Sequence, residues 1–426
     1  MLRFGGQELP AFNLKAKQYQ SVIPEGVRQI FGNGVLVLFE QTGYLVSMAR
    51  SSALRSPSAS REAPAGNFAP EKIDRERRRG RGALSNASGR YEPKVRVGFD
   101  DGWQSLEELP PFATSVTVDA TRKIITRNDS PDIGFDRSIN PYRGCEHGCV
   151  YCFARPTHAY LGLSPGLDFE SKLFVKPEAP QLLERELSAP NYQPRTIAIG
   201  TNTDPYQPID RRYKVMRGIL EVLERAGHPV GIVTKSALVL RDVDILSRMA
   251  ERNLVKVALS VTTLDAELAR TMEPRAATPA RRLETLRRLS AAGIPTAVMV
   301  APIIPAINDS EIERILDAAA AAGVQGAGYV ILRLPLEVRD LFREWLMANF
   351  PDRYRHVFKL IREMRGGKDY DSTWGLRQTG SGPYAWMIGR RFEIACEKLG
   401  LNERETNLAT KHFRPPRPSA VQLDLF

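Results

Sequence analysis

The sequence predicts an α/β fold, an open, partial barrel of six β/α units. Six short β-branched runs alternate with long amphipathic stretches, and polar motifs follow the strand-like runs. The predicted strands are residues 138–140, 196–200, 230–234, 255–260, 297–300 and 329–332. The predicted helices lie near residues 178–188, 212–226, 240–252, 279–292 and 310–322. Six units are too few for a closed eight-fold barrel, and the chemistry of such sheets lies at the carboxyl ends of the strands.

Length and composition predict one large domain with appendages, because 426 residues with 42% hydrophobic content bury a substantial core. No apolar stretch is long enough to cross a bilayer, and residues 33–48 are interrupted by Glu40 and Gln41, so they do not form a signal peptide. We therefore expect a cytoplasmic protein. A net charge of +11 favours a polyanionic partner such as nucleic acid, although a basic tail alone would also raise the total.

The regions outside the barrel differ in composition. Residues 1–47 lack periodicity, and because Met48 could be a start, we expect an upstream extension there. Residues 48–95 contain an arginine run at 75–82 and few apolar residues, so they predict a disordered basic segment that either tracks a phosphate backbone or is a solvated tail. The remaining predicted parts are a β lead-in over residues 96–135 with strand-like runs at 95–99, 114–118 and 124–125, the barrel over 136–335, a helical C-terminal cap over 336–413 and an extended tail over 414–426.

Three of the four cysteines lie within eight residues. Cys145, Cys149 and Cys152 have the spacing C-x-x-x-C-x-x-C. Thiolates suit iron–sulfur clusters and zinc, and three of them on a [4Fe–4S] cluster leave one iron open to a small molecule. A structural zinc site needs four closed ligands, with His147 or His158 as the fourth, and inert buried thiols are the remaining alternative. The motif favours an iron–sulfur cluster.

With Tyr151 before its last cysteine, the motif resembles that of the radical S-adenosylmethionine (SAM) superfamily. From about residue 121 to about 413 the chain resembles the spore photoproduct lyase-like members found outside spore-formers, most clearly at residues 130–140 and 158–170. This resemblance implies a [4Fe–4S] cluster, SAM and an electron donor such as flavodoxin or ferredoxin. It also implies reductive cleavage of SAM to a 5′-deoxyadenosyl radical that abstracts hydrogen from a substrate.

The polar stretch after the second predicted strand is the first candidate for holding SAM. It consists of Gly200, Thr201, Asn202, Thr203 and Asp204. Glycine permits close approach of the backbone, and the four polar side chains offer acceptors for an ammonium group. In the superfamily that this stretch resembles, this place binds the methionine amine. The alternative is a polar turn closed by Pro205.

Further candidates end the next strands. Lys235, followed by Ser236, is placed to reach the methionine carboxylate, and Arg275 is a second candidate for that role. Ser260 and Thr262 resemble the ribose-binding position. Ile303 lies in an apolar, proline-stiffened stretch suited either to adenine or to the core.

The return of hydrogen to the product radical is where the resemblance fails. The lyase uses a cysteine at the end of its second strand, whereas residues 198–201 of this chain contain no thiol. Cys396 is the remaining cysteine, and packing is the alternative explanation for it. The candidate catalytic residues for hydrogen relay are Tyr151, Tyr206 and Cys396, with Tyr160 as a further tyrosine.

The C-terminal part suggests contacts with macromolecules. Arg333 either faces substrate or lies at the surface, and the glycine-, arginine- and aromatic-rich residues 365–384 either bind a flipped base or only close the barrel. The proline-rich residues 414–421 predict an extended spacer. The terminal Gln422–Phe426 resembles the bacterial sliding-clamp-binding motif, with docking onto the protein's own surface as the alternative.

Taken together, the sequence predicts a radical SAM enzyme that acts on nucleic acid, in the repair or processing of DNA lesions, without a membrane partner. The first alternative is a radical SAM enzyme that modifies RNA or a protein side chain. The second is a non-catalytic, metal-stabilised nucleic-acid-binding protein.

Overall fold

The computed structural model describes two short strands near the N-terminus and residues 73–76, 78–93, 111–403 and 407–416. The chain divides into two units, Met1–Asn67 and Phe68–Phe426. In the first unit, β1 (Arg3–Phe4) pairs antiparallel with β2 (Gln7–Glu8). The predicted upstream extension falls mainly on residues outside the described ranges.

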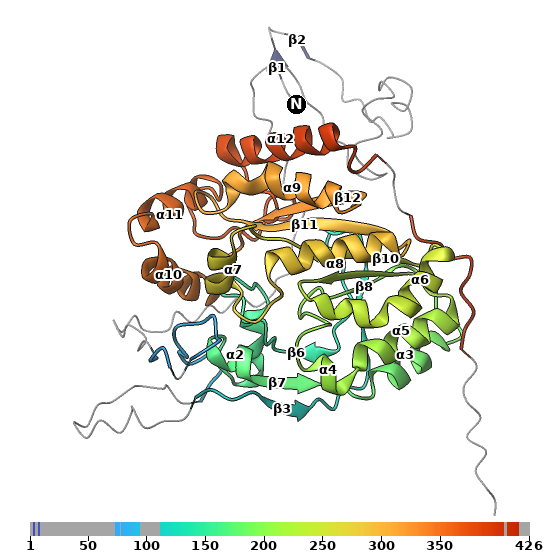
Figure 1. The fold of residues 1–426 in the computed structure, drawn as a ribbon. Helices are drawn as coiled ribbons and strands as arrows, with labels where there is room; N and C mark the ends of the chain where they lie inside the picture. The colour runs from blue at the N-terminus through green and yellow to red at the C-terminus, as the bar shows by residue number, and fades with distance from the viewer. Residues whose placement is uncertain are drawn as a thin grey trace, which may run out of the picture. The chain divides into compact units, whose positions relative to one another are not determined.

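A seven-stranded sheet forms the centre of the second unit (Figure 1). Its strand order is β12-β11-β10-β9-β8-β5-β4. Six strands run parallel: β5 (Arg137–Ile139), β8 (Ile197–Ile199), β9 (Val230–Thr234), β10 (Val255–Ser260), β11 (Thr296–Ile303) and β12 (Gly326–Ile331). The edge strand β4 (Ile125–Arg127) is antiparallel to β5. Because β12 and β4 are the two edges of the described sheet, the sheet is open, and the predicted partial barrel of six parallel strands is confirmed.

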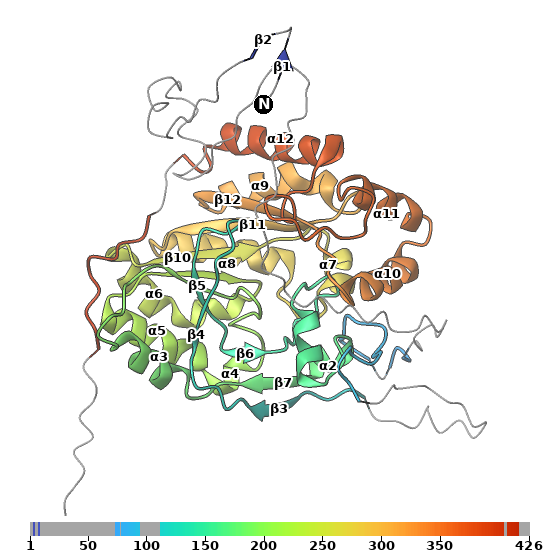
Figure 2. The ribbon, with the colours of Figure 1, turned by 180° about the vertical axis from the view of Figure 1, so that it is seen from behind.

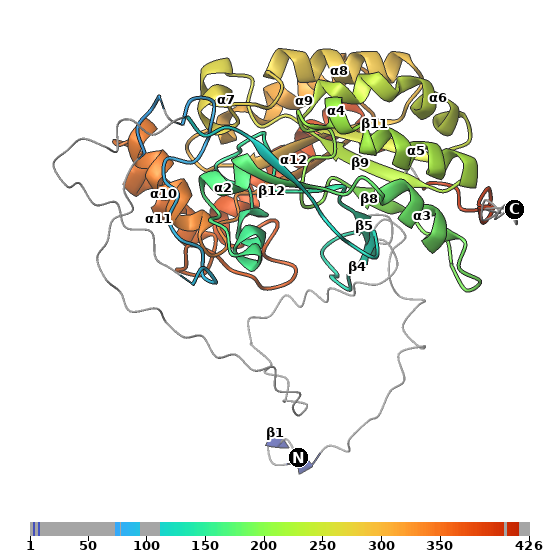
Figure 3. The same ribbon diagram turned by 90° about the horizontal axis from the view of Figure 1, so that it is seen from below.

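Helices cover the outer face of the sheet, as Figure 3 shows for α3, α5, α6 and α8. The helices between the strands are α3 (Ala179–Leu187), α4 (Asp210–Tyr213), α5 (Val215–Ala226), α6 (Val243–Glu251), α7 (Ala266–Met272), α8 (Pro279–Ala291) and α9 (Ile312–Ala321), with 3-10 turns η3 (Ala237–Asp242) and η4 (Asp309–Glu311). Their apolar residues recur at helical spacing, as in α5, where Met216, Ile219, Leu220 and Leu223 are fully buried. The main core therefore lies between the sheet and these helices.

A small second sheet supports the cysteine-containing loop. Its order is β3-β7-β6, with β3 (Ser115–Val118) parallel and β6 (Tyr142–Arg143) antiparallel to β7 (Lys172–Val175). The loop leaves β6 and is followed by η2 (Arg155–Leu161) and α2 (Leu167–Ser171). The strands predicted at 114–118 and 124–125 correspond to β3 and β4, which belong to different sheets, whereas the strand predicted at 95–99 falls on residues that are not described.

The C-terminal helices serve two different parts of the fold. Helices α10 (Val338–Asn349) and α11 (Tyr354–Glu363) bury their apolar faces in a second core cluster that also contains Val150 and Tyr151 of the cysteine loop. Helix α12 (Gly382–Leu399) instead packs on α9, and its Phe392 ring lies 4.8 Å from that of Tyr329 on β12. The helical C-terminal region is confirmed, and α12 belongs to the outer helical layer.

Residues 78–93 differ from the disordered segment predicted over residues 48–95. They lie beside α2 and α10 in both Figure 1 and Figure 2. Arg81 is 7% exposed and donates to Phe112 O at 2.8 Å and to Glu170 O at 2.5 Å. Gly82 N and Ala83 N also donate to the carboxylate of Glu170, and Ala83 packs in a small apolar cluster with Leu167 and Leu341. Hydrogen bonds and a few apolar contacts with distant residues therefore hold a segment that is poor in apolar residues. The prediction from composition was wrong for residues 78–93 because it did not take hydrogen bonds to distant residues into account.

No helix among the described residues combines the length and the hydropathy that a membrane span requires. The tail motif Gln422–Phe426 lies outside the described ranges.

Candidate cofactor site at the carboxyl ends of the strands

The cysteine loop and the ends of three strands enclose one cavity of about 100 Å³. Its lining consists of Cys145, His147, Cys149, Cys152, Phe153, Gly200, Thr201, Asn202, Thr203, Asp204, Val233, Thr234, Lys235 and Ser260. The three metal-ligand candidates and most of the SAM-binding candidates therefore meet at one place, although up to 115 residues separate them in the sequence. The sequence did not single out Phe153 or Val233, and Thr234 drew attention only as the residue before Lys235. Their position beside the motifs is the one signal that could have found them.

The three thiols are unpaired with one another and shielded from water. Cys145 and Cys149 are 7% and 8% exposed, and Cys152 is partly buried. Burial raises the pKa of each thiol. For Cys149 the carboxylate of Glu273 adds to this effect, and the charge of Lys235 opposes it. The thiolates thus need a positive partner, which bound iron supplies.

Within the described ranges, no group of three or more His, Cys, Asp or Glu side chains is arranged to hold a single metal ion. The cysteine ligands of a cluster bind different irons, so they are farther apart than the ligands of one ion. The donor set of three buried thiols beside a cavity lined with polar groups fits a cluster with one open iron and a small polar ligand.

Backbone contacts from several elements fix the cysteine loop. Cys145 N donates to Phe169 O at 2.9 Å, and Val150 N donates to Met272 O at 3.0 Å. Gly148 has a φ of +68°, which glycine adopts without strain, and a Cβ there would lie 2.7 Å from a carboxylate oxygen of Glu170. Contacts within the protein therefore define the shape of the cysteine loop.

Asp204 joins the loop after β8 to the loop after β9. Its Oδ1 accepts from Thr234 Oγ1 at 2.7 Å, and its Oδ2 accepts from Lys235 N at 2.8 Å. Burial alone would raise the pKa of Asp204, but His147 at 3.4 Å and these hydrogen bonds bring the pKa to about 2. Since protein donors occupy both oxygens, Asp204 organises the two loops, and Thr201, Asn202 and Thr203 remain along the cavity.

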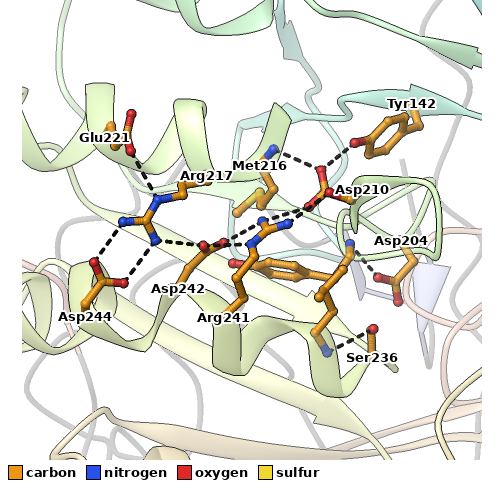
Figure 4. A network of polar contacts seen from close by, with 12 residues as sticks. Tyr142, Asp204, Asp210, Met216, Arg217, Glu221, Ser236, Arg241, Asp242 and Asp244 are labelled. Carbon is orange, nitrogen blue, oxygen red and sulfur yellow. Dashed lines mark hydrogen bonds and ion pairs between the residues drawn. The ribbon is translucent and has the colours of Figure 1, made fainter. Parts of the chain in front are cut away.

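A buried ionic network lies behind these loops (Figure 4). Asp210 accepts from Tyr142 Oη and, at 2.8 Å, from Arg241 of η3. Arg241 also contacts Asp242 at 2.8 Å, and Arg217 of α5 donates to Asp242 at 3.1 Å. The network links β6, α4, α5 and η3, so the polar stretch after β8 rests on a rigid support.

The remaining SAM-binding candidates are divided between the cavity and its surroundings. Lys235 and Ser260 line the cavity. Ser236 instead caps η3, since its Oγ accepts from Leu238 N at 3.2 Å. Arg275 donates to Glu146 Oε1 at 3.2 Å, and Ile303 is buried in the main core. The last three residues are not among those that line the cavity.

Thr262 and Tyr151 belong to one buried cluster around Glu273. Tyr151 Oη and Thr262 Oγ1 both donate to Glu273 Oε1, the latter at 2.7 Å, and Arg282 forms an ion pair with the other carboxylate oxygen. Lys235 Nζ lies 5.8 Å from the centroid of the Tyr151 ring. This cluster anchors the cysteine loop to α8, and the hydroxyl of Tyr151 is bound to protein groups.

The other two candidate catalytic residues lie in the main core. Tyr206 is fully buried, with Arg241 over its ring at 5.7 Å. Cys396 is 5% exposed on α12, where burial raises its pKa to about 11. Neither residue is part of the cavity lining. The structure therefore brings none of the three candidates for hydrogen relay into the cavity with its hydroxyl or thiol free.

Comparisons with known proteins agree with this site. A sequence model described as the radical SAM superfamily matches residues 139–319. An uncharacterized protein of Mycobacterium tuberculosis is 40% identical over 230 residues, which cover 53% of this chain and 68% of that protein. One from Methanocaldococcus jannaschii is 27% identical over 219 residues, or 51% of this chain and 78% of that protein.

Among solved structures, spore photoproduct lyase complexed with dinucleoside spore photoproduct is similar with a TM-score of 0.50 and 16% identity, over 67% of this chain and 80% of that one. This likeness concerns the fold. The residues that match the superfamily model contain strands β8 to β11 of the parallel sheet and all three clustered cysteines. The chain belongs to the radical SAM superfamily, whose cofactors are a [4Fe–4S] cluster and SAM.

Proposed function

We propose that the protein is a radical SAM enzyme that repairs or processes lesions in DNA. The observation that carries the proposal is the single cavity lined by Cys145, Cys149 and Cys152 together with Lys235 and Ser260. When bound there, the cofactors supply a 5′-deoxyadenosyl radical through one-electron reductive cleavage of SAM.

The residues of the chain have separate tasks in this proposal. The three cysteines hold the cluster and leave one iron for the methionine end of SAM. Lys235 compensates the methionine carboxylate as a point charge, and Ser260 binds the ribose. The polar side chains of residues 201–203 orient the amine. Because the cavity lies between the sheet and the cysteine loop, these elements shield a bound cofactor from part of the solvent, which protects a reactive radical.

Two observations support DNA as the substrate. The net charge of +11 favours a polyanion, and the fold is similar to that of a lyase solved with a dinucleoside photoproduct. Residues 198–201 at the end of β8 contain no thiol, so we propose that hydrogen returns to the product by a route that does not use a cysteine there.

The radical-generating step is tested by anaerobic reconstitution with iron and sulfide, followed by reduction with dithionite in the presence of SAM. We expect 5′-deoxyadenosine from the wild type and none above background from Cys149→Ala. A wild type that binds four irons but releases no 5′-deoxyadenosine would favour the non-catalytic alternative.

The substrate class is tested separately, by binding to duplex, ultraviolet-irradiated and single-stranded DNA and to RNA across salt concentrations. We expect the tightest binding to irradiated or single-stranded DNA. Tighter binding to RNA, or no binding to any nucleic acid, would favour an RNA or a protein substrate.

We further propose that Gln422–Phe426 bind a bacterial sliding clamp. The support is the sequence: a glutamine and two apolar anchors follow a proline-rich spacer. Clamp binding by the full chain is compared with that of a chain ending at Val421. Equal affinity of the two would exclude the motif.

A further inference from the structure

Residues 78–86, here called the strap, lie against the cysteine loop although they precede it by about 60 residues. We propose that the strap, together with the buried pair Arg155 and Glu170, is a positioning device that keeps the cysteine loop in its cluster-binding shape. This proposal rests on the cluster part of the proposed function and is independent of the substrate.

Glu170 is the centre of the device. It is fully buried on α2, and its carboxylate accepts from Gly82 N and from Ala83 N, each at 2.8 Å. The same carboxylate accepts from Arg155 at 2.5 Å. Two consecutive strap amides and one guanidinium therefore share one carboxylate, which fixes the strap relative to η2.

Arg155 transmits this position to the cysteine loop. It is fully buried three residues after Cys152, and it donates to Cys149 O at 2.9 Å and to Gly148 O at 3.2 Å. Its other donors reach Pro165 O and Gly166 O, both at 3.0 Å. A charge with no access to water is tolerated only because Glu170 and these carbonyls surround it. The carbonyls of the loop are thereby held at fixed points.

Close backbone packing adds a steric requirement. A Cβ on Gly82 would lie 1.8 Å from Gly148 O, so any other residue at position 82 must displace the strap or the loop. A Cβ on Gly148 would lie 2.7 Å from Glu170 Oε2. The strap, the loop and the carboxylate are in mutual contact at these two glycines.

Arg81 ties the same point to the small sheet. It donates to Glu170 O at 2.5 Å and to Thr114 Oγ1 at 3.0 Å. Thr114 in turn donates to Glu146 Oε1 at 2.7 Å, and Glu146 is the residue after Cys145. Both ends of the cysteine loop are thus connected to the strap, one through Arg155 and the other through Arg81 and Thr114.

The test compares iron and sulfide content after anaerobic reconstitution of Gly82→Ala with that of Gly134→Ala. Gly134 is the matched control because no atom lies within 4 Å of a Cβ placed there and its φ is not positive. We expect Gly82→Ala to retain less than half of the wild-type iron and to show an altered electron paramagnetic resonance spectrum when reduced, and Gly134→Ala to match the wild type. Glu170→Gln is expected to behave as Gly82→Ala does.

Circular dichroism of the metal-free variants separates positioning from folding. We expect Gly82→Ala to have the helix content of the wild type. If it is unfolded, the strap supports the whole fold and the proposal is wrong. Full iron with an unchanged spectrum in both Gly82→Ala and Glu170→Gln would also overturn it. Since neither SAM nor DNA is present, failure of the DNA proposal does not affect the result.

A second, independent observation concerns exposed aromatic residues near the end of the segment 78–93, beyond the strap. The rings of Tyr91 and Tyr160 stack at 5.2 Å, although 55% and 67% of these residues are exposed. The guanidinium of Arg90 lies 5.3 Å from the first ring and 5.7 Å from the second. Glu337 fixes Arg90 through a contact of 2.6 Å.

This group is connected to the rim of the cavity. Tyr160 belongs to η2, which begins directly after the cysteine loop, and Glu337 follows the loop that carries Arg333. Arg333 lies 4.8 Å from the ring of Phe153, which is 44% exposed and lines the cavity. The segments that carry Phe153 and Arg333 at the cavity therefore also contribute Tyr160 and Glu337 to the group around Arg90.

We infer that Tyr91, Tyr160 and Arg90 form a stacking surface for the bases of single-stranded or locally unpaired DNA. Rings and guanidinium planes stack on any base, and the basic chain attracts the phosphates. This inference rests on the proposed DNA substrate and names the form of DNA that the protein binds.

The test is the affinity for a fluorescent single-stranded oligonucleotide at fixed salt. We expect Tyr160→Ala to weaken binding about fivefold or more, the low end for loss of one stacked base, and Tyr160→Phe to bind as the wild type does. Trp386→Ala is the control, because Trp386 is 72% exposed on α12. Unchanged affinity of Tyr160→Ala would exclude the surface, whereas a wild type that binds no oligonucleotide would exclude the DNA substrate itself.

Discussion

The backbone amide of Lys235 donates to Asp204 Oδ2 at 2.8 Å. Two residues that the sequence assigned to different parts of SAM are therefore joined directly to each other by a hydrogen bond. The contact places the side chain of Lys235 beside the cavity, because its main chain cannot move without breaking a bond to a buried carboxylate. Asp204 therefore contributes to the site by holding together the loops that follow β8 and β9.

We predict that Asp204→Asn destabilises the protein by about 2–4 kcal/mol. Thr234 Oγ1, Lys235 N and His147 Nδ1 all face the carboxylate of Asp204, and the amide nitrogen of asparagine, which is itself a donor, would lie against one of them. The measurement is the free energy of unfolding in urea. Thr201→Val is the control within the same stretch, since its hydroxyl accepts only a long bond of 3.3 Å from Asn140. A stability of Asp204→Asn within error of the wild type would contradict this role.

Replacement of Lys235 is expected to act on affinity. Lys235→Met keeps the length of the chain and removes the charge, so the dissociation constant for SAM should rise at least tenfold, or about 1.4 kcal/mol. Equilibrium dialysis with the reconstituted protein measures it. Lys256→Met on the exposed side of β10 serves as the comparison and should bind SAM normally.

Cys396→Ala should leave radical generation intact. The thiol is buried in the main core on α12 and is not part of the cavity lining, so we expect 5′-deoxyadenosine production within twofold of the wild type. The lost packing should lower stability by roughly 1 kcal/mol. A complete loss of substrate conversion with normal 5′-deoxyadenosine production would instead assign hydrogen return to Cys396.

Stability should fall in mild acid because His228 is buried in neutral form. Burial lowers its pKa to about 4, while Tyr192 contacts its Nε2 at 2.8 Å. The unfolded state takes up the proton near pH 6.5, so the stabilising effect is complete above that pH and is lost as the pH falls towards 4. From pH 7 to pH 5 the contribution of His228 amounts to about 2 kcal/mol.

Urea unfolding of the wild type and of His228→Phe at the two pH values measures this contribution. The variant loses the contact with Tyr192 and is less stable at pH 7. Between pH 7 and pH 5, however, its free energy of unfolding should fall by about 2 kcal/mol less than that of the wild type. Equal declines in both proteins would show that His228 does not titrate in this range.

The order of the elements could be predicted because each is encoded locally. Runs such as Val230–Thr234 and Val255–Ser260 contain β-branched residues between turn signals, and α5 carries apolar residues at helical spacing. The strand β6 was not predicted, because it contains only Tyr142 and Arg143 and has no period to detect. The four-residue strand β7 was not predicted either.

Polar contacts between residues that are distant in the sequence were harder to predict. The residues next to Gly82 in the sequence do not indicate that its amide donates to Glu170, which lies 88 positions later. Likewise, the sequence placed Arg275 and Ser236 at the cofactor, whereas hydrogen bonds to Glu146 and Leu238 engage them elsewhere.

By itself, the sequence determined the metal-binding motif, the six parallel strands and the positions of the polar residues that follow them, because spacing and periodicity are properties of neighbouring residues. Only the tertiary structure decided which of those side chains share a cavity and which ones support it. The reason is physical: the energy of a buried carboxylate or guanidinium depends on its partners in space, and the chain brings those partners together only when it folds.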